Sequence, residues 1–162
     1  MPVKYSDSEI AEMIQEQKLL PHNYLARVQL RDKRGHKERE LDVTGNSGTE
    51  YRLILRKSDF NTIDFSIILA VNSPDSSQLF RLRRYNGRSH EHTNQIEGET
   101  FYDFHIHQAT ERYQESGARE DAFAEVTGRY ADFRTALRCM LEDCGFEMPP
   151  DTQQSLFGEF DV

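Results

Sequence analysis

Four of the six histidines in this chain fall between residues 90 and 107. They form two His-x-His pairs, His90 with His92 and His105 with His107. Residues i and i+2 share one face of a strand, so we expect Asp103, His105 and His107 to line one side of a strand. The alternate positions of that strand are apolar and should face the core.

Such a cluster supports two chemistries. Histidines of near-neutral pKa act as general base and general acid, with Asp103, His105 and His107 as the catalytic group and His90 or His92 assisting. This scheme needs no cofactor. Alternatively, neutral imidazoles and a carboxylate form the ligand set of zinc or non-haem iron. Asp103 would then either bind the metal itself or hydrogen-bond to a ligating imidazole and orient it. A purely structural polar sheet face remains a third interpretation.

One spacing in this segment resembles a known family. His90-x-His92, seven residues, Thr100, two residues and Asp103 is similar to the JAMM metallopeptidase motif, which has Ser at the position of Thr100. The resemblance covers fourteen residues and implies that His90, His92 and Asp103 bind zinc. It also implies a water-activating glutamate on an upstream strand. The candidates for that residue are Glu40 and Glu50.

Basic side chains alternate along the predicted strands that lead to the histidines. The arginines expected on outward positions are Arg27, Arg31, Arg52, Arg56, Arg81 and Arg83. Guanidinium groups offer paired donors to phosphate oxygens, and the predicted phosphate ligands are Arg81, Arg83, Arg84 and Arg88. RNA or a nucleotide would suit such a surface, with Tyr85 or Tyr102 stacking on a base.

The charge of the chain is unevenly distributed. The net charge is −8, but residues 20–88 carry thirteen Lys and Arg against eight Asp and Glu, whereas residues 89–162 carry five against sixteen. This asymmetry fits either an anionic partner on one face or two halves that attract each other. The overall acidity disfavours strong non-specific DNA binding, because such binding depends on phosphate neutralisation.

The pattern of apolar residues predicts an α+β fold. A capping box at Ser6–Glu9 starts a helix that reaches about Leu20. Five or six strands follow, five of them in the ranges 24–31, 37–43, 51–56, 64–71 and 78–85, and residues 101–107 form a possible last strand. Short links favour an antiparallel meander. From Thr110 the chain reads as helical, and the clearest helix runs from Phe133 to Cys144, with Gly145 as its C-cap and its apolar stripe on the sheet.

Length and composition place this fold in one domain of residues 1–148, followed by a tail of residues 149–162. No stretch has the ~20 apolar residues of a membrane span, and the N-terminus lacks the apolar core of a signal peptide, so we expect a cytoplasmic protein. The two cysteines, Cys139 and Cys144, should be reduced and chemically inert.

The tail contains a further motif after Pro149-Pro150. Residues 153–157, Gln-Gln-Ser-Leu-Phe, resemble the peptide with which bacterial proteins bind the replication sliding clamp. The resemblance implies that Gln153 anchors by hydrogen bonds while Leu156 and Phe157 fill an apolar pocket, with Ser155 between them.

Three functional hypotheses follow from the sequence. The first is a small prokaryotic or phage enzyme that acts on RNA or a nucleotide phosphodiester through the histidine and aspartate cluster. The second is a metal-dependent hydrolase that uses the same histidines as zinc ligands. The third is a non-catalytic binding protein of a defence, counter-defence or toxin–antitoxin system, with its acidic half as the interaction surface.

Overall fold

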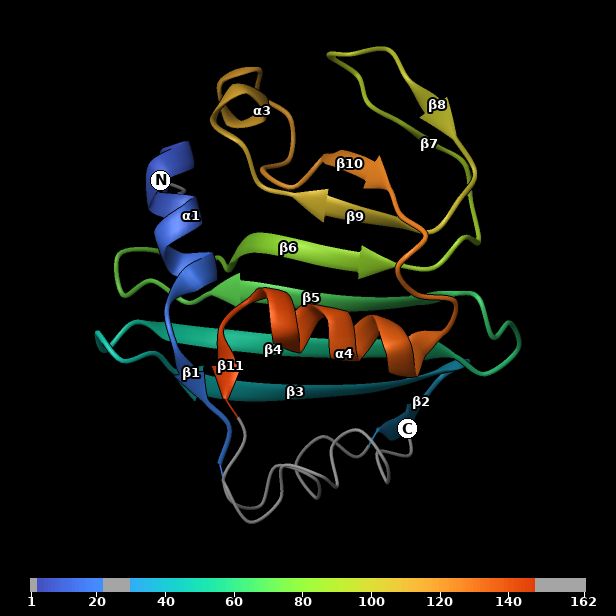
Figure 1. Cartoon of the computed structure of the whole chain (residues 1–162), viewed down its shortest axis with the longest axis horizontal. Helices are drawn as coiled ribbons and strands as arrows, with labels where there is room; N and C mark the ends of the chain where they lie inside the picture. Colours follow the sequence, from blue (N-terminus) through green and yellow to red (C-terminus); the bar gives the residue numbers. More distant parts are fainter. Residues whose placement is uncertain (1–2, 22–29, 148–162) are drawn as a thin grey trace.

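A computed structural model describes residues 3–21 and 30–147 of the chain. Its centre is one antiparallel sheet of seven strands (Figure 1). These strands are β2 (Arg31–Lys33), β3 (His36–Thr44), β4 (Glu50–Ser58), β5 (Phe65–Val71), β6 (Phe80–Asn86), β9 (His105–Gln108) and β10 (Phe123–Val126). The predicted α+β fold with an antiparallel meander is therefore confirmed.

The strand order β10-β9-β6-β5-β4-β3-β2 is a meander with one insertion. Strands β2 to β6 are neighbours in sequence and in space, because the links between them are too short for crossover connections. Between β6 and β9 the chain leaves the sheet and forms a small hairpin of β7 (His92–Thr93) and β8 (Thr100–Phe101). Figure 1 shows this hairpin beyond the β9–β10 edge, far from β2.

The two sheet faces differ in chemistry. One face carries the apolar core and is covered by the helix α4 (Phe133–Asp143), which packs on β5 and β6. The buried core residues of strands β3 to β6 are Leu41, Val43, Tyr51, Leu53, Leu55, Phe65, Ile67, Leu69, Val71, Phe80, Leu82 and Tyr85. The opposite face carries polar side chains on the central strands, among them Arg56 on β4, Ser66 on β5 and Arg84 on β6.

Capping side chains start both helices that frame the sheet, and the one at Ser6 is the predicted one. Ser6 and Glu9 form the capping box of α1 (Asp7–Gln15), and Asp132 caps α4. The α4 positions predicted to be apolar are buried, from Phe133 to Leu141. Gly145 follows the C-cap with φ 76°, a left-handed conformation that glycine adopts without a steric penalty.

A buried lysine joins the two helix ends. The Lys18 ammonium donates to main-chain oxygens at the end of α1, including Met13 O and Glu16 O at 2.7 and 2.8 Å, and to Cys144 O after α4 at 2.7 Å. Cations stabilise helix C-termini, so one charge serves both helices. Next to it, β1 (Lys18–Leu19) pairs in parallel with β11 (Phe146–Glu147).

The last third of the chain departs from the predicted pattern. The helix α3 spans only Glu111–Glu115, and β10 follows where a helix was expected. The chain from 101 to 107 is not one strand, because residues 102–104 break between β8 and β9. Likewise α1 ends at Gln15, before the predicted end near Leu20.

In the described ranges, no helix has the length and apolar character needed to cross a membrane. The predicted tail of residues 149–162, with its clamp-like peptide at 153–157, lies outside those ranges, as does Arg27.

Candidate metal centre

Strand β9 places His105 and His107 on the sheet face opposite α4. Its alternation puts Ile106 towards the apolar core, where it is the Cα partner of Tyr85. On the other face His105 pairs with Asn86 and His107 with Arg84 across β6. The two imidazoles are buried, each with 4% of its surface exposed. The expectation that these two histidines share a face is confirmed.

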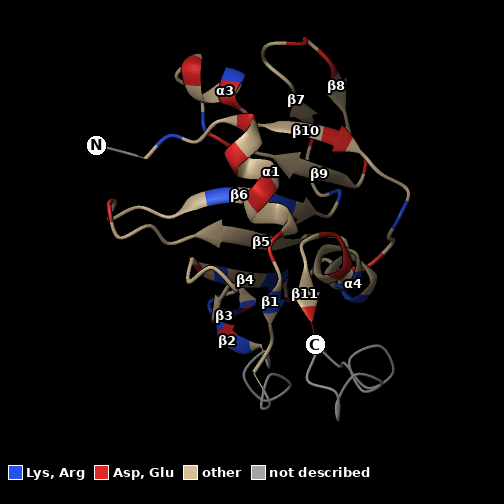
Figure 2. Ribbon diagram, turned by 60° about the vertical axis from the view of Figure 1, so that its left-hand side comes forward, with Lys and Arg blue, Asp and Glu red and all other residues tan. Residues whose placement is uncertain are grey.

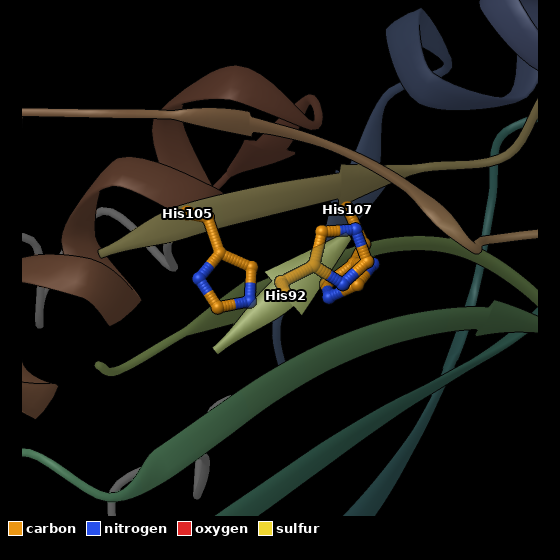
Figure 3. A group of neighbouring side chains, drawn as sticks. All are labelled: His92, His105 and His107. Atoms are coloured by element: carbon orange, nitrogen blue, oxygen red, sulfur yellow. The ribbon is translucent and has the colours of Figure 1, made fainter. Parts of the chain in front are cut away.

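The β7–β8 hairpin brings a third histidine onto them. The His92 ring lies 4.8 Å from the His107 ring and 5.5 Å from the His105 ring, measured between centroids. One nitrogen from each ring lies within 4.8 Å of one from each of the others. Figure 3 shows the three side chains gathered at one point, two from β9 and one from β7.

Two of the imidazoles have their tautomer fixed by a main-chain carbonyl. Nδ1 of His105 lies 2.7 Å from the carbonyl oxygen of Asp103, and Nδ1 of His107 lies 2.8 Å from that of Asp121. Since a carbonyl only accepts, each Nδ1 carries the proton and donates it. The Nε2 lone pair of both rings is therefore free.

Asn94 fixes the third imidazole. Its side-chain amide pairs with the edge of β10, where Oδ1 accepts from Ala124 N at 2.9 Å and Nδ2 donates to Ala124 O at 2.8 Å. These bonds determine the orientation of the amide, and Oδ1 also faces Nε2 of His92 at 2.8 Å. His92 must donate from Nε2 to this acceptor, which leaves its Nδ1 lone pair free.

The environment keeps both β9 histidines neutral. Burial, together with the positive charge of Arg84, lowers the pKa of His107 to about 2. Burial also lowers the pKa of His105, although its hydrogen bond to the Asp103 carbonyl acts in the opposite direction. A histidine held neutral is a poor proton donor at neutral pH but a good metal ligand.

A buried ion pair supports the centre. The Asp121 carboxylate is fully buried, with Arg84 Nε 3.2 Å from Oδ2 and Arg119 Nε 3.1 Å from Oδ1. Within the described ranges, Arg84 Nε and these two oxygens are the fully buried side-chain atoms that lack a hydrogen bond of good geometry.

The structure separates the other predicted site residues from this group. His90 is exposed and contacts Ser89. The Asp103 side chain is also exposed, and this residue contributes its carbonyl oxygen rather than its carboxylate. Among the residues that the structure describes, the metal-competent group is His92, His105 and His107. Of the zinc ligands that the JAMM resemblance implies, His90, His92 and Asp103, this group contains only His92.

The predicted phosphate ligands divide between the two faces. Arg84 lies beside His107, and Arg81 shares its face and hydrogen-bonds through its main chain to Glu120. Arg83 lies on the core face with Tyr85, near Asp143, and the register shift between Leu69 and Ala70 puts Arg81 on the opposite face. The Arg88 guanidinium lies over the Phe104 ring, 5.7 Å from its centroid.

Sequence reasoning missed the two residues that orient the cluster, Asn94 and Asp121. Asn94 stands two positions after His92, so it shares a face with that histidine in an extended segment. Asp121 acts through its carbonyl oxygen as well as its carboxylate, and the carbonyl role has no sequence signal. Comparisons with protein-family models, curated proteins and solved structures give no match.

The Asn94 amide provides a first test. Asn94→Ala leaves the main-chain N–H and C=O of Ala124 without partners, and each unmet buried group costs about 1–3 kcal/mol. We expect a loss of about 2–4 kcal/mol in the free energy of unfolding, measured by urea denaturation. The control Asn72→Ala removes an exposed amide and should leave stability within about 0.5 kcal/mol of wild type. Equal stabilities for the two variants would contradict the assigned role.

Because His107 is neutral in the folded chain, we expect the free energy of unfolding of the metal-free protein, measured with chelator present, to depend on pH. The unfolded chain protonates this residue near its ordinary pKa of about 6.5, whereas the folded chain does not. Its contribution is complete above pH 6.5 and is lost as the pH falls. Between pH 7 and 5 the loss is about 2 kcal/mol. His107→Asn keeps the donor to Asp121 and should show a correspondingly smaller loss in urea titrations.

The matched control for this experiment is His90→Asn, at an exposed position. It should keep the wild-type dependence on pH. A His107→Asn protein that loses as much stability as wild type between the two pH values would show that His107 is protonated in the folded chain.

Proposed function

We propose that this protein is a metal-dependent phosphoesterase whose zinc is held by His92, His105 and His107. One observation carries the proposal: three imidazoles converge, and each has its outer nitrogen hydrogen-bonded to an acceptor that the fold holds in place. Metal-binding histidines usually have such a partner on the second nitrogen, because it fixes the tautomer and the ring orientation.

The free nitrogens are His92 Nδ1, His105 Nε2 and His107 Nε2. Zinc binds imidazole nitrogen at about 2.0–2.1 Å, which places tetrahedral ligands about 3.3 Å apart. One nitrogen of each ring lies within 4.8 Å of one nitrogen of each of the others, so three nitrogens of this group would reach the zinc spacing by movements of about 1.5 Å or less.

Three protein ligands favour catalysis over a purely structural role. Structural zinc sites generally have four protein ligands, whereas catalytic sites have three and keep one position for water or substrate. Zinc lowers the pKa of bound water to about 7, so hydroxide is available at neutral pH.

Arg84 supports phosphate as the reacting group. Its Cα pairs directly with that of His107, so the guanidinium flanks the centre on the same sheet face. In the proposed reaction, hydroxide would attack phosphorus, the bond from phosphorus to the leaving oxygen would break, and that oxygen would take a proton from solvent water. Arg84 would stabilise the negative charge that develops on the phosphoryl oxygens.

The metal-dependent scheme is favoured over metal-free acid–base catalysis by two observations. The Asp103 carboxylate, which the metal-free scheme requires, is exposed. The lowered pKa of His107 also keeps its ring neutral at neutral pH, so it would not serve as the general acid.

Zinc content and hydrolysis of bis(p-nitrophenyl) phosphate test the proposal together. We expect about one zinc per chain and zinc-dependent hydrolysis. His105→Asn and His107→Asn keep the Nδ1-type donor and lose the free nitrogen, while His92→Gln keeps the Nε2-type donor to Asn94. Each should lower zinc affinity at least about 100-fold and abolish hydrolysis, with folding retained by circular dichroism.

The control is His90→Gln, assayed for zinc content alone. It should bind zinc as wild type does, whereas a JAMM-type site would lose its metal. Full zinc content without hydrolysis would indicate a structural site and would overturn the enzymatic proposal. Wild-type zinc affinity in the three designed variants would overturn the ligand assignment.

A further inference from the structure

A pocket of about 430 Å³ opens on the polar sheet face beside the histidines. Its volume is in the range of small-molecule sites. The charged and imidazole side chains that line it are Arg34, His36, Arg56, Asp64, Arg84 and His90. The sheet register explains the gathering, because Arg56, Ser66 and Asn86 are successive cross-strand partners on β4, β5 and β6.

The pocket adjoins the candidate metal centre. Two of its lining residues, Arg84 and Asn86, are the direct Cα partners of His107 and His105. Paired residues of antiparallel strands lie about 5 Å apart with their side chains on the same face. A ligand in the pocket would therefore have one end next to the three imidazoles.

The charge of the pocket suits an anion. Three guanidinium groups face a single carboxylate, that of Asp64, which accepts a hydrogen bond from Ser89 at 3.1 Å. Arg84 is paired with Asp121, but Arg34 and Arg56 have no ion-pair partner within the described part of the chain. Arginines without carboxylate partners in a concave site are suited to bidentate recognition of phosphate. Figure 2 shows the wider setting, with Lys and Arg on β2, β3 and β6 and Asp and Glu on α1 and β10.

An aromatic ring stands at the edge of the pocket. Phe60 is 87% exposed, the highest value among the large apolar side chains that the structure describes. Its loop is held by Ser58 Oγ, which accepts from Phe60 N at 3.1 Å and from Asn61 N at 3.2 Å. Gly35 lines the pocket, and a Cβ at that position would lie 3.7 Å from the Phe60 ring. A largely exposed ring such as that of Phe60, beside a pocket lined by arginines, is suited to stacking on a nucleobase.

We propose that this pocket binds a nucleotide, with its phosphate on Arg34, Arg56 and Arg84 and its base stacked on Phe60. The inference rests on the proposed function in one respect, since it makes the nucleotide phosphate the group presented to the histidines. The binding itself depends only on the pocket, so it is testable without metal.

The test is calorimetric titration of the metal-free protein in chelator with adenosine 5′-monophosphate, ribose 5-phosphate and inorganic phosphate. We expect the nucleotide to bind at least about tenfold more tightly than ribose 5-phosphate, because only the nucleotide stacks. Phe60→Ala should remove this difference and Phe60→Tyr should keep it. Arg56→Ala should weaken both organic phosphates at least about tenfold.

Two outcomes would overturn the inference. One is equal affinity for the nucleotide and ribose 5-phosphate in the wild-type protein, which would make the pocket a simple phosphate site. The other is no binding of any of the three probes at millimolar concentration. His107→Asn should bind the nucleotide normally while failing to hydrolyse bis(p-nitrophenyl) phosphate. Zinc-dependent hydrolysis without nucleotide preference would therefore refute this inference and leave the proposed function standing.

Discussion

Strand β9 is hydrogen-bonded on both edges, to β6 and to β10, and both of its faces are covered. A strand in that position normally carries apolar residues on each face, yet one face of β9 carries His105 and His107. Buried polar groups require hydrogen-bond partners, and the carbonyls of Asp103 and Asp121 supply one for each ring. This requirement fixes the tautomers, and the tautomers determine which nitrogens are free.

The hairpin of β7 and β8 completes the arrangement. Asn94 binds the outer edge of β10 through both atoms of its amide, which removes an open sheet edge and positions His92 above the β9 histidines. Arg84 then links the cluster to its surroundings, since it pairs with Asp121 behind His107 and lines the neighbouring pocket. In the proposed site, β9 and the hairpin would thus hold the metal. Arg84 on β6 would stabilise charge, and the pocket beside it would bind the substrate.

The sequence predicts the regular strands and helices of this molecule well, because the spacing of apolar residues shows which face of each element is buried. The meander, the capping box at Ser6 and the stripe of α4 are examples. Three features of the structure were not predicted from the sequence, each for a physical reason. Strand β10 is only four residues long. The register shift at Leu69 and Ala70 puts Arg81 and Arg83 on different faces, and the contact of His92 with the β9 histidines joins residues far apart in the sequence. The pairing of His105 with His107 was predictable because it is local, whereas the choice of His92 over His90 depends on Asn94 and Ala124.

The position of the bound metal tests the central claim most directly. Crystals of the zinc-loaded protein, measured at the zinc absorption edge, give an anomalous difference peak that locates the ion independently of any assumption about ligands. The three-histidine centre predicts one peak about 2.0–2.1 Å from His92 Nδ1, His105 Nε2 and His107 Nε2, with a fourth position open to solvent. A peak bound by His90 and Asp103, or no peak at the three imidazoles, would contradict it.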